Sequence, residues 1–200
     1  MKIGMMYAMD GEIESLLKNE NAHLIEKVSG ASFYQIRENV VACAGGVGKV
    51  NAAMSTQLLL SRYAPDVVLN VGVAGCFENV PIGTLVLATG FVQHDSDTSA
   101  LGDPVGLVST VNKVEFPTAW PEKARAAMDK TGLPYRTGLV ATGDWFATDT
   151  PAATGSTTPS TPCCARWRGR RGPGVLPKRR AVPLPEVRQR LRAGAPRLLL

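Results

Sequence analysis

The sequence predicts a protein of the α/β class, in which strands and helices alternate along the chain. Residues 66–72 and 85–92 are apolar at consecutive positions, which is typical of strands that are covered on both faces. Between such stretches, apolar residues recur three and four positions apart, as they do on one face of a helix. Because a helix is the usual connection between parallel strands, this alternation favours a mostly parallel sheet between helical layers.

The first elements follow from short apolar runs and the residues that end them. A strand over residues 2–8 ends at Asp10-Gly11, and we expect Asp10 to cap a helix with Glu12 in its first turn. The apolar face of this helix consists of Ile13, Leu16 and Leu17. Two strands, over residues 32–36 and 40–43, are then joined by a polar turn.

Residues 44–53, AGGVGKVNAA, open a second predicted helix. We expect its apolar face to consist of Val47, Val50, Met54 and Leu58. A further helix is predicted near residues 121–130 and a strand near residues 137–142.

The composition changes near the end of this pattern. Residues 1–165 carry a net charge of −5, whereas residues 166–200 carry +10. Eight of the fourteen prolines follow residue 150, where Ile, Phe, Met and Asp are absent. We therefore divide the chain into an α/β domain of residues 1–147 and a tail of residues 148–200 that we expect to be non-native and disordered.

Candidate ligand-binding residues follow the ends of the predicted strands, where ligands lie in sheets of this kind. Glu12 stands out, because a carboxylate there can act as a base or hold a water molecule. The alternative is that it only complements the helix dipole. The loop Gly45–Lys49 fails the P-loop pattern, because Val50 follows the lysine, and it fails GxGxxG, because Asn51 replaces the third glycine. It is either a tight turn or a set of amides that approaches a ligand.

Other sequence features narrow the function classes. His94, Asp95 and Asp97 lack further histidines or cysteines at ligand spacing, so we predict no metal site. No apolar stretch approaches the ~20 residues that cross a bilayer, and the start of the chain does not resemble a signal peptide. Four cysteines without paired CxxC motifs favour the cytoplasm. The basic residues 166–192 are a weak candidate for a nucleic-acid arm, and we expect no nucleic-acid partner.

Several stretches together resemble the 5′-methylthioadenosine/S-adenosylhomocysteine nucleosidases of the purine nucleoside phosphorylase superfamily. They are KIGMMYAMDGEIESL, AGGVGKVNAA, PDVVLNVGVAG, HDSDTSALG and ATGDWF, within residues 1 to about 147. The resemblance implies a three-layer α/β/α sandwich with a mixed central sheet, incomplete here at the C-terminus. It also implies a homodimer without metal or redox cofactor that hydrolyses the N-glycosidic bond of adenine thionucleosides.

The same resemblance assigns roles to particular residues. Glu12 matches the catalytic glutamate that activates water, Phe146 the ring stacked on adenine, and Ala147 the backbone that bonds the purine edge. Gly75 matches a glycine below the base and ribose, and Met9 and Val47 match the apolar wall of the ribose and alkylthio side. Val73 stands where the family usually has serine, and residues 94–102 match a loop on the rim that faces the dimer partner.

The reaction needs a second group that the chain lacks. Breaking the bond requires an acid that protonates the leaving purine and a carboxylate that serves the water opposite. In the family the acid is an Asp of a Ser-Asp motif near the C-terminus, preceded by a Met-Glu pair that binds ribose. Beyond Asp149 this chain has only Glu186 as an acidic residue, without the matching context. We therefore expect the chain as written to be nearly inactive.

Back-translation offers an explanation of the tail. Permitted codons for residues 165–171 spell Glu-Met-Glu-Gly-Ala-Ala in a shifted frame, and those for residues 187–192 spell Phe-Val-Ser-Asp-Ser-Ala. The tail is thus interpreted as a frameshifted reading of the family's C-terminus. Two alternative functions stay open: a phosphate-dependent purine nucleoside phosphorylase, and a catalytically dead nucleoside-binding or nucleic-acid-binding protein.

Overall fold

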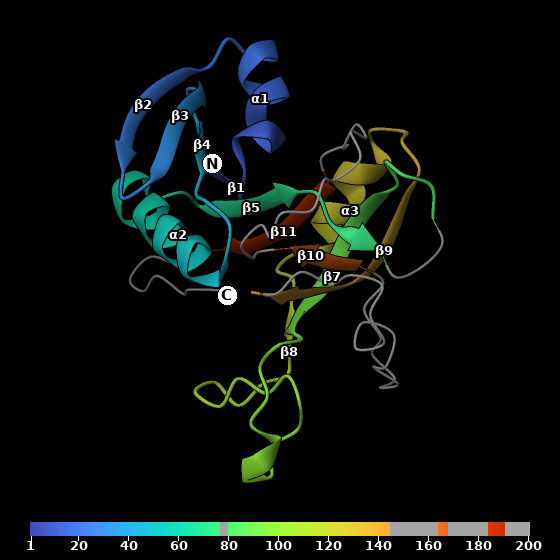
Figure 1. The fold of residues 1–200 in the computed structure, drawn as a ribbon. Helices are drawn as coiled ribbons and strands as arrows, with labels where there is room; N and C mark the ends of the chain where they lie inside the picture. Colours follow the sequence, from blue (N-terminus) through green and yellow to red (C-terminus); the bar gives the residue numbers. More distant parts are fainter. Residues whose placement is uncertain (77–79, 145–163, 168–183, 191–200) are drawn as a thin grey trace.

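The structure is a computed structural model that describes residues 1–76, 80–144, 164–167 and 184–190, the last two stretches by their backbone alone. Its helices and strands alternate as the sequence predicts (Figure 1). They are β1 (Ile3–Tyr7), α1 (Asp10–Asn19), β2 (His23–Val28), β3 (Ala31–Arg37), β4 (Val40–Ala44), α2 (Lys49–Tyr63), β5 (Val67–Gly72), β6 (Gly75–Cys76), β7 (Leu85–Gln93), the 3-10 helix η1 (Ser99–Leu101), β8 (Glu115–Pro117), α3 (Pro121–Asp129), β9 (Tyr135–Gly143), β10 (Cys164–Trp167) and β11 (Leu184–Arg190).

The strands form two mixed sheets rather than the mostly parallel sheet that alternation favoured. One has the order β11-β5-β1-β4-β3-β2 and the other β6-β10-β9-β7-β8. Strand β1 pairs in parallel with β4 and β5, and β7 and β10 pair in parallel with β9. The pairs β2–β3, β3–β4 and β7–β8 are antiparallel. Short connections such as the Glu38-Asn39 turn explain the difference, because they leave no room for a helical crossover.

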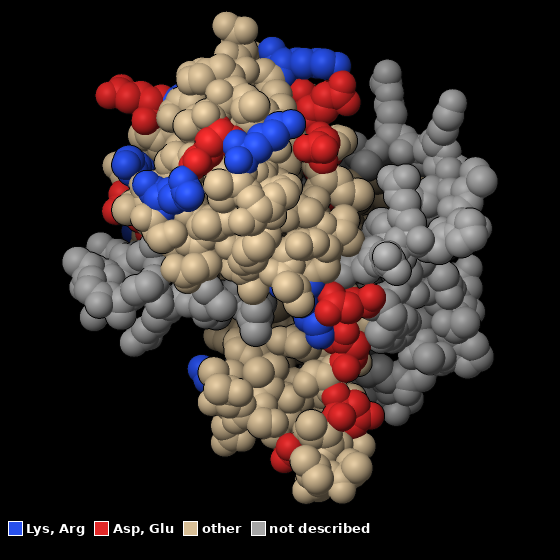
Figure 2. Space-filling model, turned by 60° about the vertical axis from the view of Figure 1, so that its left-hand side comes forward, with Lys and Arg blue, Asp and Glu red and all other residues tan. Residues whose placement is uncertain are grey.

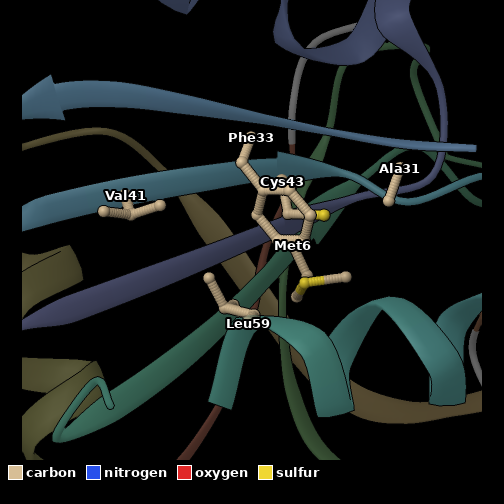
Figure 3. Packing of buried hydrophobic residues seen from close by; sticks show 6 residues of the cluster. All are labelled: Met6, Ala31, Phe33, Val41, Cys43 and Leu59. Carbon is tan, nitrogen blue, oxygen red and sulfur yellow. The ribbon is translucent and has the colours of Figure 1, made fainter. Parts of the chain in front are cut away.

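Helices α1 and α2 pack on opposite faces of the first sheet, which gives the three-layer arrangement. Along β4, Val41 and Cys43 belong to a buried cluster with Leu59 of α2, whereas Ala42 and Ala44 belong to a cluster with Ile13 of α1. Successive side chains of a strand point to opposite faces, so both faces of β4 are covered. Figure 3 shows the α2 side, where Leu59 lies below Phe33, Met6 and Cys43. The α/β fold with a mixed sheet is thereby confirmed.

The start of α1 differs by one residue from the expectation. Asp10 is the first helical residue, and Met9, with an extended backbone (φ −130°, ψ 146°), occupies the N-cap position. The carboxylate of Glu12 reaches back and accepts a hydrogen bond from the Met9 amide at 3.0 Å. Because the third helical residue already satisfies that amide, the helix begins without Asp10 as its cap.

The predicted apolar face of α2 was wrong at Val50 and right at Leu58, which packs against the core, and strand β2 was missed. Val50 is 78% exposed, and the buried residues of the helix are Ser55, Leu59 and Leu60. The sheet decides this orientation, because glycines there admit the helix closely. A Cβ atom on Gly4 would lie 2.8 Å from Leu59 Cδ2. Strand β2 was not expected because its side chains are mostly exposed, so it lacks an apolar run.

Gly45 is the second point of close approach, and its substitution is expected to destabilise the fold. A Cβ atom there would lie 2.6 Å from the Ser55 Cβ atom, and Ser55 is fully buried. Gly45→Ala therefore forces α2 away from β4 and should lower the free energy of unfolding by about 1–3 kcal/mol. Urea denaturation measures this change. Gly11→Ala is the control, since its Cβ atom meets nothing within 4 Å; an equal loss in both variants would contradict the prediction.

Two described strands, β10 and β11, lie inside the tail for which disorder was predicted. Strand β10 pairs with β9 and β6, and β11 pairs with β5. Their sequences gave no periodic signal, and backbone pairing with a free strand edge does not require one. The division into a domain and a disordered tail stays a prediction, and the rest of the tail lies outside the described residues.

The chain between β7 and β8 projects from the body of the molecule (Figure 1). It carries exposed apolar side chains at Leu101, Val105 and Val111. Among the described residues, no helix is both long and apolar enough to cross a membrane.

Candidate active site

Three predicted ligand-binding segments begin at one edge of the first sheet. Strand β1 pairs in parallel with β4, with Tyr7 opposite Ala44, and with β5, with Met6 opposite Asn70. The carboxyl ends of the three strands therefore lie side by side, and Met9, the glycine loop (Gly45–Gly48) and Val73 follow them. This is the edge at which sheets of this class bind ligands.

Glu12 joins two of these strand ends through its carboxylate. Its Oε2 atom accepts hydrogen bonds from the amides of Ala8 at 2.9 Å and Met9 at 3.0 Å. Its Oε1 atom accepts a hydrogen bond from the amide of Val73 at 2.9 Å. A carboxylate offers about four acceptor positions, so three backbone amides leave about one for a water molecule. The alternative in which Glu12 only faces the helix dipole does not account for the Val73 bond.

Two other ionisable groups near this edge stay neutral. Burial, with the charge of Glu12 as a second cause, raises the pKa of Tyr7 to about 12. Burial alone raises the pKa of the Cys43 thiol to about 12. A thiol with so high a pKa is unreactive, because the thiolate is the nucleophile. Both residues are therefore packing groups in this structure.

The glycine loop turns through backbone conformations that favour glycine. Gly46 and Gly48 have φ angles of 90° and 105°. The side chain of Asn51, the residue that breaks the dinucleotide pattern, donates a hydrogen bond to the carbonyl of Val47 at 2.7 Å. This hydrogen bond from the first turn of α2 holds the loop, and Val47 lies half-buried at its centre.

Lys49, the first residue of α2, connects this loop to the second sheet. Its ammonium group lies 2.8 Å from Asp95 Oδ1 and 3.9 Å from Asp144 Oδ2. Its backbone amide donates a hydrogen bond to Asp144 Oδ1 at 2.8 Å. The amide of Asp144 in turn donates to Asp95 Oδ2 at 2.7 Å. We call Lys49, Asp95 and Asp144 the Lys49 triad.

The electrostatics of the triad match its hydrogen bonds. Burial by itself would raise the pKa of Asp95, but hydrogen bonds from Lys49 and the Asp144 amide outweigh it, and the pKa lies below its usual value. Burial lowers the pKa of His94; the charge of Asp95 opposes this shift and that of Lys49 adds to it. Asp95 is therefore a charged partner of Lys49 beside a neutral imidazole.

The predicted site residues are distributed unevenly over the structure. Met9 and Glu12 are hydrogen-bonded to each other, and Val47 follows the neighbouring strand β4. Gly75 lies in β6, exposed, two residues beyond Val73. Phe146 and Ala147 lie outside the described residues. The assigned roles of all six residues stay predictions.

Sequence reasoning missed the partnership of Lys49 with Asp144. Lys49 was noted only as part of a failed P-loop, and Asp144 only as part of the stretch ATGDWF. The available signal was that each follows the carboxyl end of a predicted strand. Because they are 95 positions apart, only the tertiary structure pairs them.

Comparison with known proteins identifies relatives for most of the chain. The family model of the phosphorylase superfamily matches residues 2–158. A 5′-methylthioadenosine/S-adenosylhomocysteine nucleosidase of Anoxybacillus flavithermus is 38% identical over 159 residues, which cover 74% of this chain and 67% of the relative. A Staphylococcus aureus protein of the same name is 36% identical over 152 residues, covering 72% and 65%. The chain thus spans about two thirds of the length of these relatives.

Solved structures of the same kind have a similar fold. The crystal structure of a Campylobacter jejuni 5′-methylthioadenosine/S-adenosylhomocysteine nucleosidase aligns with a TM-score of 0.74 and 28% identity, covering 84% of this chain and 75% of that chain. A Helicobacter pylori nucleosidase aligns with a TM-score of 0.76 at 24% identity, over 83% and 74% of the two chains, and supports the fold alone. On the family match and the identities above, this chain belongs to the phosphorylase superfamily.

Proposed function

We propose that this chain is a 5′-methylthioadenosine/S-adenosylhomocysteine nucleosidase, which hydrolyses the N-glycosidic bond and releases adenine. The observation that carries the proposal is the Glu12 carboxylate, held by backbone amides from the ends of β1 and β5. The identity of 36–38% to proteins of that name supports the same substrate class. No metal or redox cofactor has a part in this proposal.

The proposed reaction assigns Glu12 to the water. The bond between C1′ of the ribose and N9 of adenine breaks, and its electron pair leaves with the purine. The oxygen of a water molecule bonds to C1′, and the proton that this water loses passes to the Glu12 carboxylate. The departing adenine anion takes a proton from solvent, and Glu12 returns its proton to solvent. The remaining acceptor position of Glu12 suits that water. Met9 and Val47, which follow β1 and β4, are proposed to form the apolar wall of the ribose and alkylthio side. Gly75, Phe146 and Ala147 are proposed to lie on the purine side.

Water is favoured over phosphate as the nucleophile because three backbone amides and the lysine at this edge already have partners. The amides of Ala8, Met9 and Val73 donate to Glu12, whose negative charge repels a second anion. The ammonium group of Lys49 is paired with Asp95 and Asp144. On the face shown in Figure 2, the basic side chains of the described residues mostly lie beside acidic ones and form no continuous basic patch. A phosphorylase would require the opposite arrangement.

The first test is adenine release from 5′-methylthioadenosine by the protein of verified mass. Liquid chromatography should detect adenine and free methylthioribose at a rate that added phosphate leaves unchanged. A phosphate-dependent rate, with a sugar phosphate as product, would show a phosphorylase instead. Binding of the nucleoside without any cleavage would support a catalytically dead binding protein.

The leaving group provides a sharper prediction, because the chain lacks the expected acid. A missing general acid lowers the rate by about 10²–10⁴-fold when the leaving group needs a proton. A 4-nitrophenyl glycoside of 5-methylthioribose releases a stable anion, so its hydrolysis does not need that acid. We expect absorbance measurements to show hydrolysis of this compound at least about 10²-fold faster than that of 5′-methylthioadenosine. Equal rates would show that an acid is present after all.

We further propose a homodimer and a cytoplasmic location. The exposed Leu101, Val105 and Val111 of the projecting segment support a surface that a second copy covers. The free, buried thiol of Cys43 suits a reducing compartment. The division into a domain of residues 1–147 and a frameshifted tail also stays a proposal, which the coding DNA across codons 148–200 tests directly.

A further inference from the structure

Helix α2 lacks an N-terminal cap of its own. Its N-cap residue is Gly48, which has no side chain to accept a hydrogen bond, and its first turn contains no acidic residue. The first amides of a helix have no partner within it, and they carry the positive end of the helix dipole. A capping group for α2 therefore has to come from elsewhere in the fold.

Asp144, at the end of β9, supplies that group across the two sheets. Its Oδ1 atom accepts, at 2.8 Å, the hydrogen bond of the Lys49 amide, which is the first of the helix amides that have no partner within the helix. The same carboxylate brings a negative charge to the helix N-terminus. A residue 95 positions away in the sequence thus acts as the cap of α2.

Asp95 closes the connection and is shielded from solvent. The side chain of Asp95 is 12% exposed and that of Lys49 is 24% exposed, so their ion pair is screened less than a surface pair. Asp95 also accepts the hydrogen bond from the Asp144 amide. The ends of β7 and β9 are packed tightly here, because a Cβ atom on Gly143 would lie 2.5 Å from His94 Cε1. Asp95 and Asp144, the partners of Lys49, are therefore held in place by their mutual hydrogen bond and by the close packing of Gly143 against His94.

We propose that the Lys49 triad is a positioning device that sets the glycine loop, and with it Val47, relative to the carboxyl ends of β7 and β9. The proposal rests on the proposed function in one respect, namely that a nucleoside binds at this edge. The triad acts through the loop and does not touch the reacting atoms. Without it, the loop and the second sheet lose the hydrogen bond and the ion pair that join them, and the Val47 wall of the pocket moves.

The decisive variant is Asp144→Ala, which removes the cap and leaves Asp95 as the partner of Lys49. Calorimetric titration with 5′-methylthioadenosine should show at least roughly fivefold weaker binding, the size of coupling typical within one hydrogen-bonded charge network. Asp144→Asn keeps an oxygen that accepts the Lys49 amide, and we expect it to restore affinity to within about twofold of the unchanged chain. If the substitutions acted only by lowering the stability of the fold, Asp144→Ala and Asp144→Asn would not differ in nucleoside affinity in this way.

The control is the exposed ion pair of Arg37 with Glu20, which joins β3 to α1. Arg37 donates two hydrogen bonds, at 2.6 and 2.7 Å, so its geometry is at least as good as that of the triad. Arg37→Met should leave the nucleoside affinity unchanged. Equal affinities of Asp144→Ala and the unchanged chain, or an equal loss in Arg37→Met, would overturn the positioning role while the proposed function stands.

Hydrogen exchange separates this proposal from the proposed function. In Asp144→Ala the amides at the start of α2, Lys49 to Asn51, should exchange at least roughly tenfold faster than in the unchanged chain, with those near Leu59 unaffected. This measurement needs no ligand. If the unchanged chain does not bind the nucleoside, the proposed function fails, but the positioning role of the triad can still be tested by hydrogen exchange. Faster exchange in Asp144→Ala that is confined to the start of α2 supports that role. Equal exchange rates in Asp144→Ala and the unchanged chain overturn it.

Discussion

Replacing Glu12 by glutamine is expected to lower the rate of glycoside hydrolysis by about 10²–10⁴-fold, because an amide cannot accept the proton of the attacking water. The 4-nitrophenyl glycoside is the substrate of choice, since its hydrolysis isolates the water side of the reaction. Single-turnover measurement with protein in excess gives the rate without a contribution from product release.

Glu12→Gln should also weaken the fold, for a reason that the structure makes specific. The carboxylate accepts hydrogen bonds from three backbone amides, on both of its oxygens. Glutamine offers one oxygen and one amide group, so at least one backbone N–H group faces another donor. An unsatisfied buried donor costs about 1–3 kcal/mol. Urea denaturation should show this loss alongside the loss of rate.

Glu14→Gln is the matched control, because it makes the same chemical change one half-turn further along α1. Glu14 is exposed and forms an ion pair with Lys18, four residues later. It should keep both the rate and the stability. A Glu12→Gln protein that hydrolyses the glycoside as fast as the Glu14→Gln protein would refute the role of Glu12.

Phe33→Ala is expected to lower the free energy of unfolding by about 3–5 kcal/mol. Phe33 is fully buried between the first sheet and α2, in the cluster drawn in Figure 3, and its ring lies 5.4 Å from that of Tyr63. Removing the ring leaves a cavity that neighbouring Leu59 and Met6 cannot fill without moving helix or strand. Domains of this size have about 5–15 kcal/mol of stability in total, so the variant should be partly unfolded at 37 °C.

The control for this change is Leu24→Ala, on the adjacent strand β2. Leu24 is 46% exposed and lies in the same sheet. Its truncation should change stability by no more than about 0.5 kcal/mol. Thermal unfolding followed by circular dichroism compares the two, and similar midpoints for Phe33→Ala and Leu24→Ala would show that the cluster is not the core.

Local sequence patterns were sufficient to predict an element when its own apolar residues indicate which of its faces are buried. Residues 66–72 predicted β5 because a strand covered on both faces is apolar throughout, and Ile13, Leu16 and Leu17 predicted the buried side of α1 because helical spacing places them together. The same reasoning failed for α2, whose apolar residues occur on more than one side. There, the positions of Gly4 and Gly45 in the sheet selected the face that contains Ser55 and Leu59.

For the candidate site, the position of a residue after a predicted strand indicated where it lies, but the sequence did not indicate which residues are paired with it. Glu12 could be chosen because it follows the first strand within one helical turn, and that alone predicts the edge at which it lies. Its bond to Val73 depends on the parallel pairing of β1 with β5, which no local pattern specifies. Phe146 and Ala147 rest on the family resemblance.

The sequence by itself determined the α/β class, the order of most elements and a carboxylate at the first strand end, since short-range periodicity and turn residues encode these. The tertiary structure alone decided that Glu12 accepts three amides from two strands and that Asp144 caps a helix far from it in the chain. The physical reason is that hydrogen bonds and ion pairs join groups by their distance in space. The fold, and not the spacing of residues, brings those groups within 3 Å.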